Sequence, residues 1–141
     1  SQLLGSRTTL VRALLFDKPP GRSWLVPWHR DVVFPSSEGP RTRLPTEALQ
    51  RMLVVRVHLD AASVGAGALR VLPGSHRDPC PTARPACPLA IAAGVPIEAA
   101  RGDVLLMSPL LLHRSGRNHL AESRRRVLHL DLGSARSGCG P

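Results

Sequence analysis

The sequence predicts an all-β fold, a sandwich or barrel built from short strands. Its apolar residues fall in runs of strand length that are rich in Val and Leu. Clusters of Pro and Gly separate these runs, as expected of turns. With 141 residues, of which 43% are apolar, the chain is long enough for one domain with a hydrophobic core. We therefore expect a single β domain over residues 1–141.

The predicted strands follow one another along the whole chain. In order they are TLVRALLFD (9–17), SWLVPWHRDVVF (23–34), RMLVVRVHLD (51–60), ALRVLP (68–73), DVLLMSP (103–109) and RRVLHLDL (125–132). The first three are followed by the turn sequences KPPG, PSSEGP and VGAG. A short helix is expected only in PTEALQRM (45–52), where Thr46 can cap it. The proline-rich stretch 78–88 predicts an exposed loop.

Charge and composition narrow the classes of partner. The formal charge of +9 suits nucleic acid, an acidic membrane surface or an anionic substrate. The arginines are scattered from Arg7 to Arg136 and are not gathered on one element. Two Trp, two Phe and no Tyr offer little aromatic surface for stacking on bases. Nucleic acid is therefore not the partner that the sequence favours.

The cysteines indicate a reducing compartment. Cys80, Cys87 and Cys139 cannot all pair, and none stands in a C-x-x-C arrangement, so neither a zinc site nor a disulfide framework is indicated. The chain has no apolar run of about 18 residues and no charged-then-apolar leader at its start. We expect a cytoplasmic protein without a membrane partner, and the oligomeric state stays open.

A recurring H-x-D spacing marks the candidate metal ligands. In an extended chain, residues two apart point to the same side, so such a pair can hold one metal ion. The spacing occurs in WHRD (His29, Asp31), VHLD (His58, Asp60) and LHLD (His129, Asp131). The spacing alone does not choose among the three.

The order of the motifs along the chain indicates a family. WHRD is followed by ALRVLPGSHR (68–77), RGDVLLMSPLLLHRSGRN (101–118) and SRRRVLHLDL (123–132). In this order the stretches resemble the phytanoyl-CoA dioxygenase family of iron(II)- and 2-oxoglutarate-dependent oxygenases. That family shows a WHQD-like segment, an LRV-PGSH turn, a GD-L-PLLLH strand and a final RR-A/V-L strand. The resemblance covers Leu14 to Leu132. It implies a double-stranded β-helix, the cupin-like jelly roll, with few short helices.

The resemblance also implies a metal site. It makes WHRD the ligand segment, with His29, Asp31 and the distant His113 as the facial triad of Fe(II). His58 and His129 are then expected to be hydrogen-bonded residues of the interior or of a sheet surface. Because we place the ligands at an open end that buries little apolar area, replacing His113 with alanine should remove turnover at little cost in stability.

A binding site for the co-substrate 2-oxoglutarate follows from the same resemblance. In the family an arginine roughly a dozen residues after the distal histidine holds the far carboxylate, for which a planar guanidinium is well suited. Three consecutive arginines are candidates, and the family pattern, two positions before the small apolar Val127, selects Arg125. Arg124 and Arg126 should face the opposite side of the strand. Ser115 matches a family hydroxyl near 2-oxoglutarate.

The expected activity is hydroxylation of a small organic substrate with O2, as 2-oxoglutarate is converted to succinate and carbon dioxide. The carboxylate of Asp31 favours hydroxylation, because family-like halogenases replace it to let halide bind. Arg30 stands where the family has a glutamine. Family members typically have more helices and strands before the FDK segment (16–18), so we expect the N-terminal part to be missing. The alternative is a non-catalytic or truncated jelly roll that acts as a binding module; a nucleic-acid dioxygenase and a zinc-dependent cupin-like enzyme are further rivals.

Overall fold

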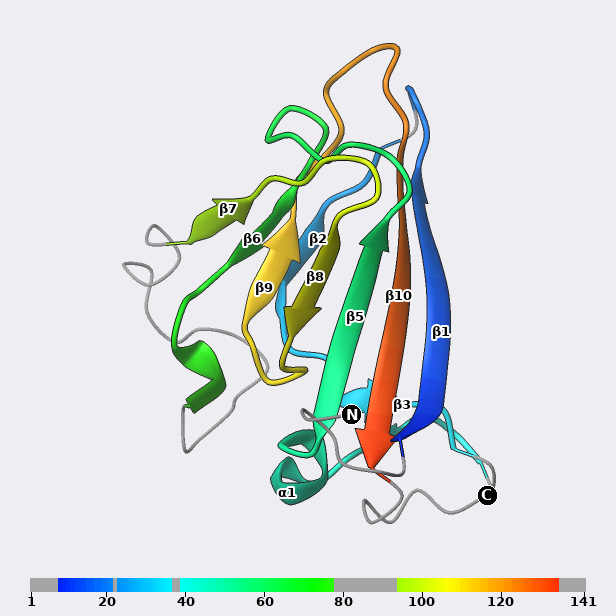
Figure 1. Cartoon of the computed structure of the whole chain (residues 1–141), viewed down its shortest axis with the longest axis vertical. Helices are drawn as coiled ribbons and strands as arrows, with labels where there is room; N and C mark the ends of the chain where they lie inside the picture. The colour runs from blue at the N-terminus through cyan, green and yellow to red at the C-terminus, as the bar shows by residue number, and fades with distance from the viewer. Residues whose placement is uncertain (1–7, 22, 37–38, 78–93, 135–141) are drawn as a thin grey trace.

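The computed structural model describes residues 8–21, 23–36, 39–77 and 94–134. Within them the chain forms the predicted double-stranded β-helix, in which two antiparallel four-stranded sheets face each other (Figure 1). No helix among these residues is long and apolar enough to cross a bilayer. The predicted loop 78–88 and the three cysteines lie outside the described residues.

The first sheet contains the longest strands. Its order is β1 (Thr8–Lys18), β10 (Arg125–Ser134), β5 (Met52–His58) and β8 (Val104–Met107). The second sheet runs β2 (Val26–His29), β9 (His113–Ser115), β6 (Leu69–Val71) and β7 (Val95–Ile97). A separate hairpin pairs β3 (Val33–Phe34) with β4 (Thr42–Arg43). The helical turns are α1 (Thr46–Leu49) and a 3-10 turn over Ser75–Arg77.

Strand alternation produces a core whose two ends differ in polarity. β5 alternates buried and half-buried residues along its whole length. Its first inward residues, Met52 and Val54, belong to apolar clusters. Its next inward residues, Arg56 and His58, are also buried although they are polar. The interior between the sheets is therefore apolar at one end of β5 and polar at the other, where a site can form.

The structure corrects two local expectations. The stretch 23–34 forms two strands, because the chain turns after His29: the amide of Asp31 donates to the Pro109 carbonyl at 3.0 Å and so leaves the β2 ladder. The capping role of Thr46 is wrong, since Pro45 occupies the N-cap position and no side chain caps the helix. Three short strands, β4, β7 and β9, have no separate counterpart in the predicted elements.

Candidate metal centre

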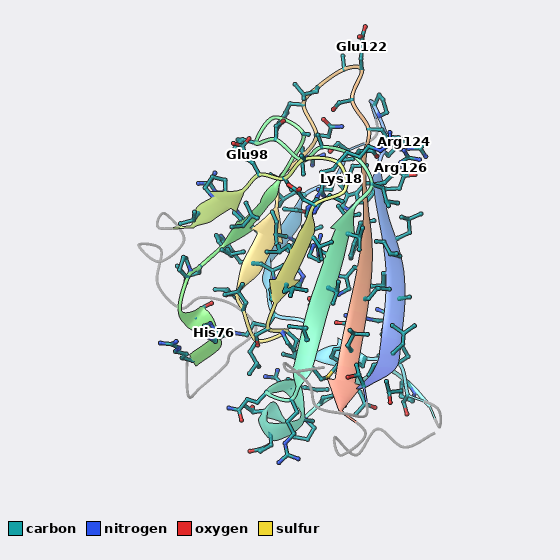
Figure 2. All side chains as sticks on the ribbon, viewed as in Figure 1. Lys18, His76, Glu98, Glu122, Arg124 and Arg126 are labelled. Atoms are coloured by element: carbon teal, nitrogen blue, oxygen red, sulfur yellow. The ribbon has the colours of Figure 1, made fainter. Side chains whose placement is uncertain are left out.

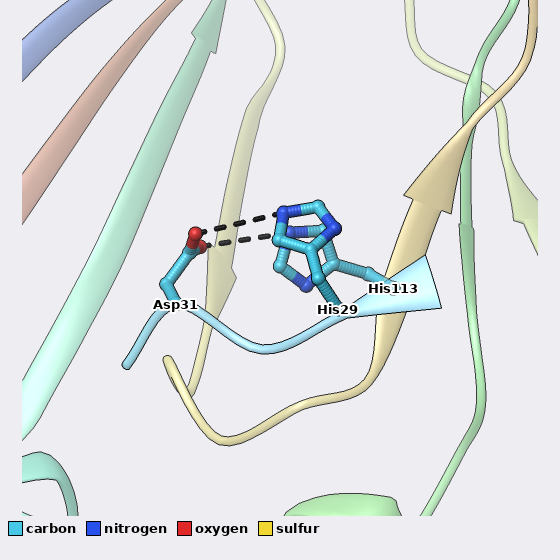
Figure 3. A group of neighbouring side chains, drawn as sticks. All are labelled: His29, Asp31 and His113. Atoms are coloured by element: carbon cyan, nitrogen blue, oxygen red, sulfur yellow. Dashed lines mark ion pairs between the residues drawn. The ribbon is translucent and has the colours of Figure 1, made fainter. Parts of the chain in front are cut away.

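The three predicted ligands come together between the ends of two strands of the second sheet. His29 ends β2 and His113 begins β9, and the two are direct cross-strand partners with ring centroids 4.2 Å apart. Asp31 follows β2 and turns its carboxylate toward both imidazoles (Figure 3). Its oxygens lie 3.7 Å from Nε2 of His29 and 3.5 Å from Nε2 of His113.

Backbone contacts determine which ring nitrogen of each histidine carries hydrogen. Nδ1 of His29 lies 2.8 Å from the Pro27 carbonyl, and Nδ1 of His113 lies 2.8 Å from the Leu111 carbonyl. A carbonyl oxygen only accepts, so each Nδ1 donates, and in a neutral ring Nε2 then faces Asp31 with a lone pair.

Donor atoms of His113 and Asp31 are free for a cation. Burial, with the neighbouring His29 adding to it and Asp31 opposing it, lowers the pKa of His113 to about 4, which keeps the ring neutral at pH 7. Oδ2 of Asp31 is buried without a hydrogen-bond partner. Two imidazole nitrogens and a carboxylate that converge in this way are a donor set suited to a divalent first-row metal such as Fe(II).

The three side chains differ in their access to solvent. The side chain of His29 is 33% exposed, that of Asp31 13% and that of His113 only 2%. The open rim that we expected is therefore present at His29 and absent at His113. The expected low stability cost of replacing His113 does not hold, because the change would leave a hole in the interior.

Arg30, between the two ligands of WHRD, supports the backbone around them. It is buried, and it donates to the carbonyls of Leu110 at 2.8 Å and Ser75 at 3.0 Å. It thereby ties the ligand segment to the turn before β9 and to the 3-10 turn. At the position of the family glutamine, this chain therefore has an arginine that binds neighbouring backbone carbonyls.

The second H-x-D pair does not form a site. Asp60 accepts hydrogen bonds from the side chain of Arg126 at 2.8 Å, whereas Nδ1 of His58 lies 3.3 Å from the Asp103 carbonyl. Burial lowers the pKa of His58. His58 is thus the hydrogen-bonded interior residue that we expected. The third pair, His129 and Asp131, lies close to Asp31 and is considered below.

The arginine run alternates as predicted. Arg125 is 2% exposed, and its Nε has no hydrogen-bond partner. Burial, with Arg56 adding to it, lowers the pKa of Arg125 to about 10. Arg124 pairs with Asp17 and Arg126 with Asp60, both on the exposed side near the start of β10 (Figure 2). Only Arg125 of the three therefore reaches the interior.

Lys18 is a buried cation that the sequence reasoning missed. It is 1% exposed and lies opposite Arg125 in the β1–β10 ladder. Its Nζ donates to Oγ of Ser115 at 3.0 Å and to the Gly116 carbonyl. Burial, followed by the charges of Arg125 and Arg56, lowers its pKa to about 8. The available signal was that Lys18 is the only lysine in the chain.

Ser115 connects this cationic end to the candidate metal centre. It is buried and lies two residues after His113 on β9, so both side chains point to the same side of the strand. A step of two residues along a strand is roughly 6 to 7 Å. Ser115 therefore places the buried charge of Lys18 about one such step along β9 from His113.

An apolar pocket borders the candidate centre. Its volume is about 330 Å³, and its lining includes Val71, Ile97, Met107 and Leu111. Val71 is the cross-strand partner of His113, and the carbonyl of Leu111 orients the His113 ring. The pocket is thus lined by neighbours of His113, and none of the three predicted ligands is among its lining residues.

Comparison with protein families gives a match over residues 1–126 to the family described as Phytanoyl-CoA dioxygenase (PhyH). No curated protein matches the chain by sequence.

Three solved structures illustrate the similarity in fold. AviO1 from Streptomyces viridochromogenes Tue57 is 27% identical, with a TM-score of 0.66 over 95% of this chain and 53% of AviO1. A nickel complex of the non-heme monooxygenase ThoJ is 20% identical (TM-score 0.69; 96% of this chain and 48% of ThoJ). EvdO2 from Micromonospora carbonacea var. aurantiaca, complexed with 2-oxoglutarate, is 23% identical (TM-score 0.67; 92% and 53%). The chain spans about half the length of these three proteins.

Proposed function

Because the chain belongs to the phytanoyl-CoA dioxygenase family, we propose that it is the jelly-roll part of an Fe(II)- and 2-oxoglutarate-dependent dioxygenase that hydroxylates a small organic substrate. The observation that supports this most directly is the convergence of the Nε2 atoms of His29 and His113 and a buried carboxylate oxygen on one point. In this proposal His29, Asp31 and His113 hold the metal. The metal-bound neighbour ThoJ and the 2-oxoglutarate complex of EvdO2 have the same fold.

The proposed reaction is balanced by the co-substrate. Fe(II), when bound together with 2-oxoglutarate, supplies the activation of O2. One oxygen atom enters a C–H bond of the substrate as a hydroxyl group, and the other enters the new carboxylate of succinate as carbon dioxide leaves. The protein's own part is to hold and orient both reactants and to keep His113 unprotonated. The intact carboxylate of Asp31 favours hydroxylation over halogenation.

The cationic end of the interior is suited to the far carboxylate of 2-oxoglutarate. Arg125 offers a buried guanidinium whose Nε has no other partner, and an arginine grips a carboxylate through two parallel hydrogen bonds. Ser115 can donate its hydroxyl hydrogen to the same carboxylate. Lys18 donates a hydrogen bond to Oγ of Ser115, and its positive charge stabilises the bound anion.

The apolar pocket supports a small-molecule substrate. A volume of about 330 Å³ lies at the lower end of the range of small-molecule sites. Its lining offers packing and few hydrogen bonds, so it suits an apolar portion of a substrate whose reacting carbon faces His113.

Anaerobic titration followed by oxygen tests the function in two stages. Fe(II) and 2-oxoglutarate added to the purified protein without O2 should give the weak visible charge-transfer band of the chelate. Admitting O2 should then release succinate, slowly even without substrate, and faster with the right one. Absence of the band would refute the site. A band that never leads to succinate would favour the non-catalytic binding module.

A further inference from the structure

Asp31 also belongs to a second group of side chains, and the other members of that group have no role in the proposed function. Nε2 of His129 and the carboxylates of Asp131 and Asp31 present ligand atoms that all lie within 4.8 Å of one another. His129 is 1% exposed and Asp131 is completely buried. Both come from the middle of β10 and face the second sheet across the interior. Such a cluster is either a second metal site or a support for the first one.

The hydrogen bond from Arg56 excludes a second metal at His129. An Nη of Arg56 lies 2.9 Å from Nδ1 of His129. A guanidinium has donors only, so Nδ1 accepts and the ring hydrogen is on Nε2. That Nε2 lies 3.2 Å from Oδ1 of Asp131 and 3.9 Å from Oδ2 of Asp31. A protonated nitrogen has no lone pair for a metal, so His129 acts as a donor toward the two carboxylates.

Arg12 completes the arrangement from the other side. Its Nε donates to Oδ2 of Asp131 at 2.7 Å, and its Nη2 lies 3.9 Å from Oδ1 of Asp31. The guanidinium also donates to the Val33 carbonyl at 3.2 Å and lies 4.5 Å from the ring centre of Phe34. Arg12 therefore links β1 to the segment directly after the ligand aspartate.

Asp131 keeps both donors in place. Burial alone would raise its pKa, but the hydrogen bonds from His129 and Arg12 outweigh burial, and the pKa of Asp131 is lowered. The ionised carboxylate of Asp131 thus holds an N–H group of His129 and one of Arg12 near the two carboxylate oxygens of Asp31. Both stay 3.9 Å from the Asp31 oxygens, which is too far for a hydrogen bond and close enough for charge and dipole to act.

We propose that His129, Asp131 and Arg12 are positioning residues for the metal carboxylate: they hold Asp31 aimed at His29 and His113 while leaving its lone pairs free for the metal. This inference rests on the proposed function, because it assigns to Asp31 the role of ligand. It predicts that the metal affinity of the protein depends on a side chain that never touches the metal.

Two substitutions of His129 separate positioning from ligation. Glutamine can accept from Arg56 through its oxygen and donate to the carboxylates through its amide, whereas leucine can do neither. Ni(II) binding, measured by calorimetry without 2-oxoglutarate or O2, should weaken roughly 10- to 100-fold in His129→Leu and by less than about threefold in His129→Gln. Thermal unfolding of the metal-free variants provides the check of folding.

The other outcomes overturn the inference. Equal loss in both variants would make His129 a ligand, and unchanged affinity in a folded His129→Leu would make it purely structural. If His129→Leu does not fold, Arg12→Gln tests the same support, since it removes the charge beside Asp31 and should also weaken Ni(II) binding. His58→Gln, at another buried histidine on the same sheet, is the matched control and should bind Ni(II) like the wild type. If the wild type binds no Ni(II), the proposed function itself fails.

Discussion

Lys18 lies directly opposite Arg125 in the β1–β10 ladder, so two buried cations face the same interior space. The charge of Arg125 makes a charge on Lys18 less favourable, and the charge of Arg56 does so for both side chains. Like charges buried together favour an anion between them. A carboxylate of the co-substrate fits this description, and the following predictions test it.

Replacing Arg125 with alanine should weaken 2-oxoglutarate binding steeply. Loss of a charged, partly buried hydrogen-bonding partner costs on the order of 2 to 4 kcal/mol, or roughly 30- to 1000-fold in affinity. The measurement is an anaerobic titration of the Fe(II)-loaded protein with 2-oxoglutarate, followed through the charge-transfer band.

Arg124→Ala and Arg126→Ala are the matched controls. Both side chains are exposed and engaged in surface ion pairs with Asp17 and Asp60, so each change should alter the affinity less than about threefold. A larger effect at either position than at Arg125 would mean that the anchor is in another register of β10.

Because of Lys18, the free energy of unfolding of the metal-free protein should rise with pH in the alkaline range. Its pKa is about 8 in the folded chain and 10.5 in the unfolded chain, so between these values the unfolded state binds more protons. The free energy of unfolding should therefore increase from pH 8 to pH 10.5, by on the order of 3 kcal/mol at most. Urea unfolding of the wild type and of Lys18→Met measures it, and a rise of equal size in the variant would exclude Lys18 as its source.

Binding of 2-oxoglutarate should show the opposite dependence on pH. The anion favours the charged form of Lys18, so affinity should fall above about pH 8, by up to tenfold per pH unit. In Lys18→Met the affinity should be lower at pH 7 and nearly flat up to pH 9. A wild-type affinity that does not change over this range would show that Lys18 does not contact the co-substrate.

The side chains of β10 and its neighbouring strands show which features the sequence could predict and which it could not. Alternation is a local property of an extended chain, so it correctly separated Arg125 from Arg124 and Arg126. It does not say which face is inside, and a polar side chain is by default assigned to solvent. For that reason Lys18 and Arg56 were missed, although both are buried.

The prediction of the ligand set depended on the order of the motifs along the chain. His29 and Asp31 share a strand segment, but only the pairing of β2 with β9 brings His113 beside them, and no local pattern in the chain encodes that pairing. Motif order supplied it through the family. Motif order could not predict which ring nitrogen of each histidine carries the hydrogen, because that depends on the carbonyls of Pro27 and Leu111. The role of the three residues as metal ligands stays a prediction.

Replacing His29 with alanine should abolish the stabilisation of the folded protein by metal. A metal present at a hundred times its dissociation constant adds about 2.7 kcal/mol to the free energy of unfolding of the wild type. The midpoint of anaerobic thermal unfolding should therefore rise with Ni(II) for the wild type and stay constant for His29→Ala. His119→Ala, at an exposed histidine outside the site, is the control and should respond like the wild type. An undiminished response of His29→Ala would remove His29 from the ligand set.

His113→Ala should also abolish metal binding, but unlike His29→Ala it should destabilise the metal-free protein. The His113 side chain is 2% exposed, lies beside Val71 and donates to the Leu111 carbonyl, so its removal leaves a hole and an unpaired carbonyl. A cost of about 2 kcal/mol or more is expected, against less than about 1 kcal/mol for the half-exposed His29. Urea unfolding of the two metal-free variants at pH 7 measures the difference directly. Equal costs would mean that the interior closes around position 113, and that the ligand is held less rigidly than its burial indicates.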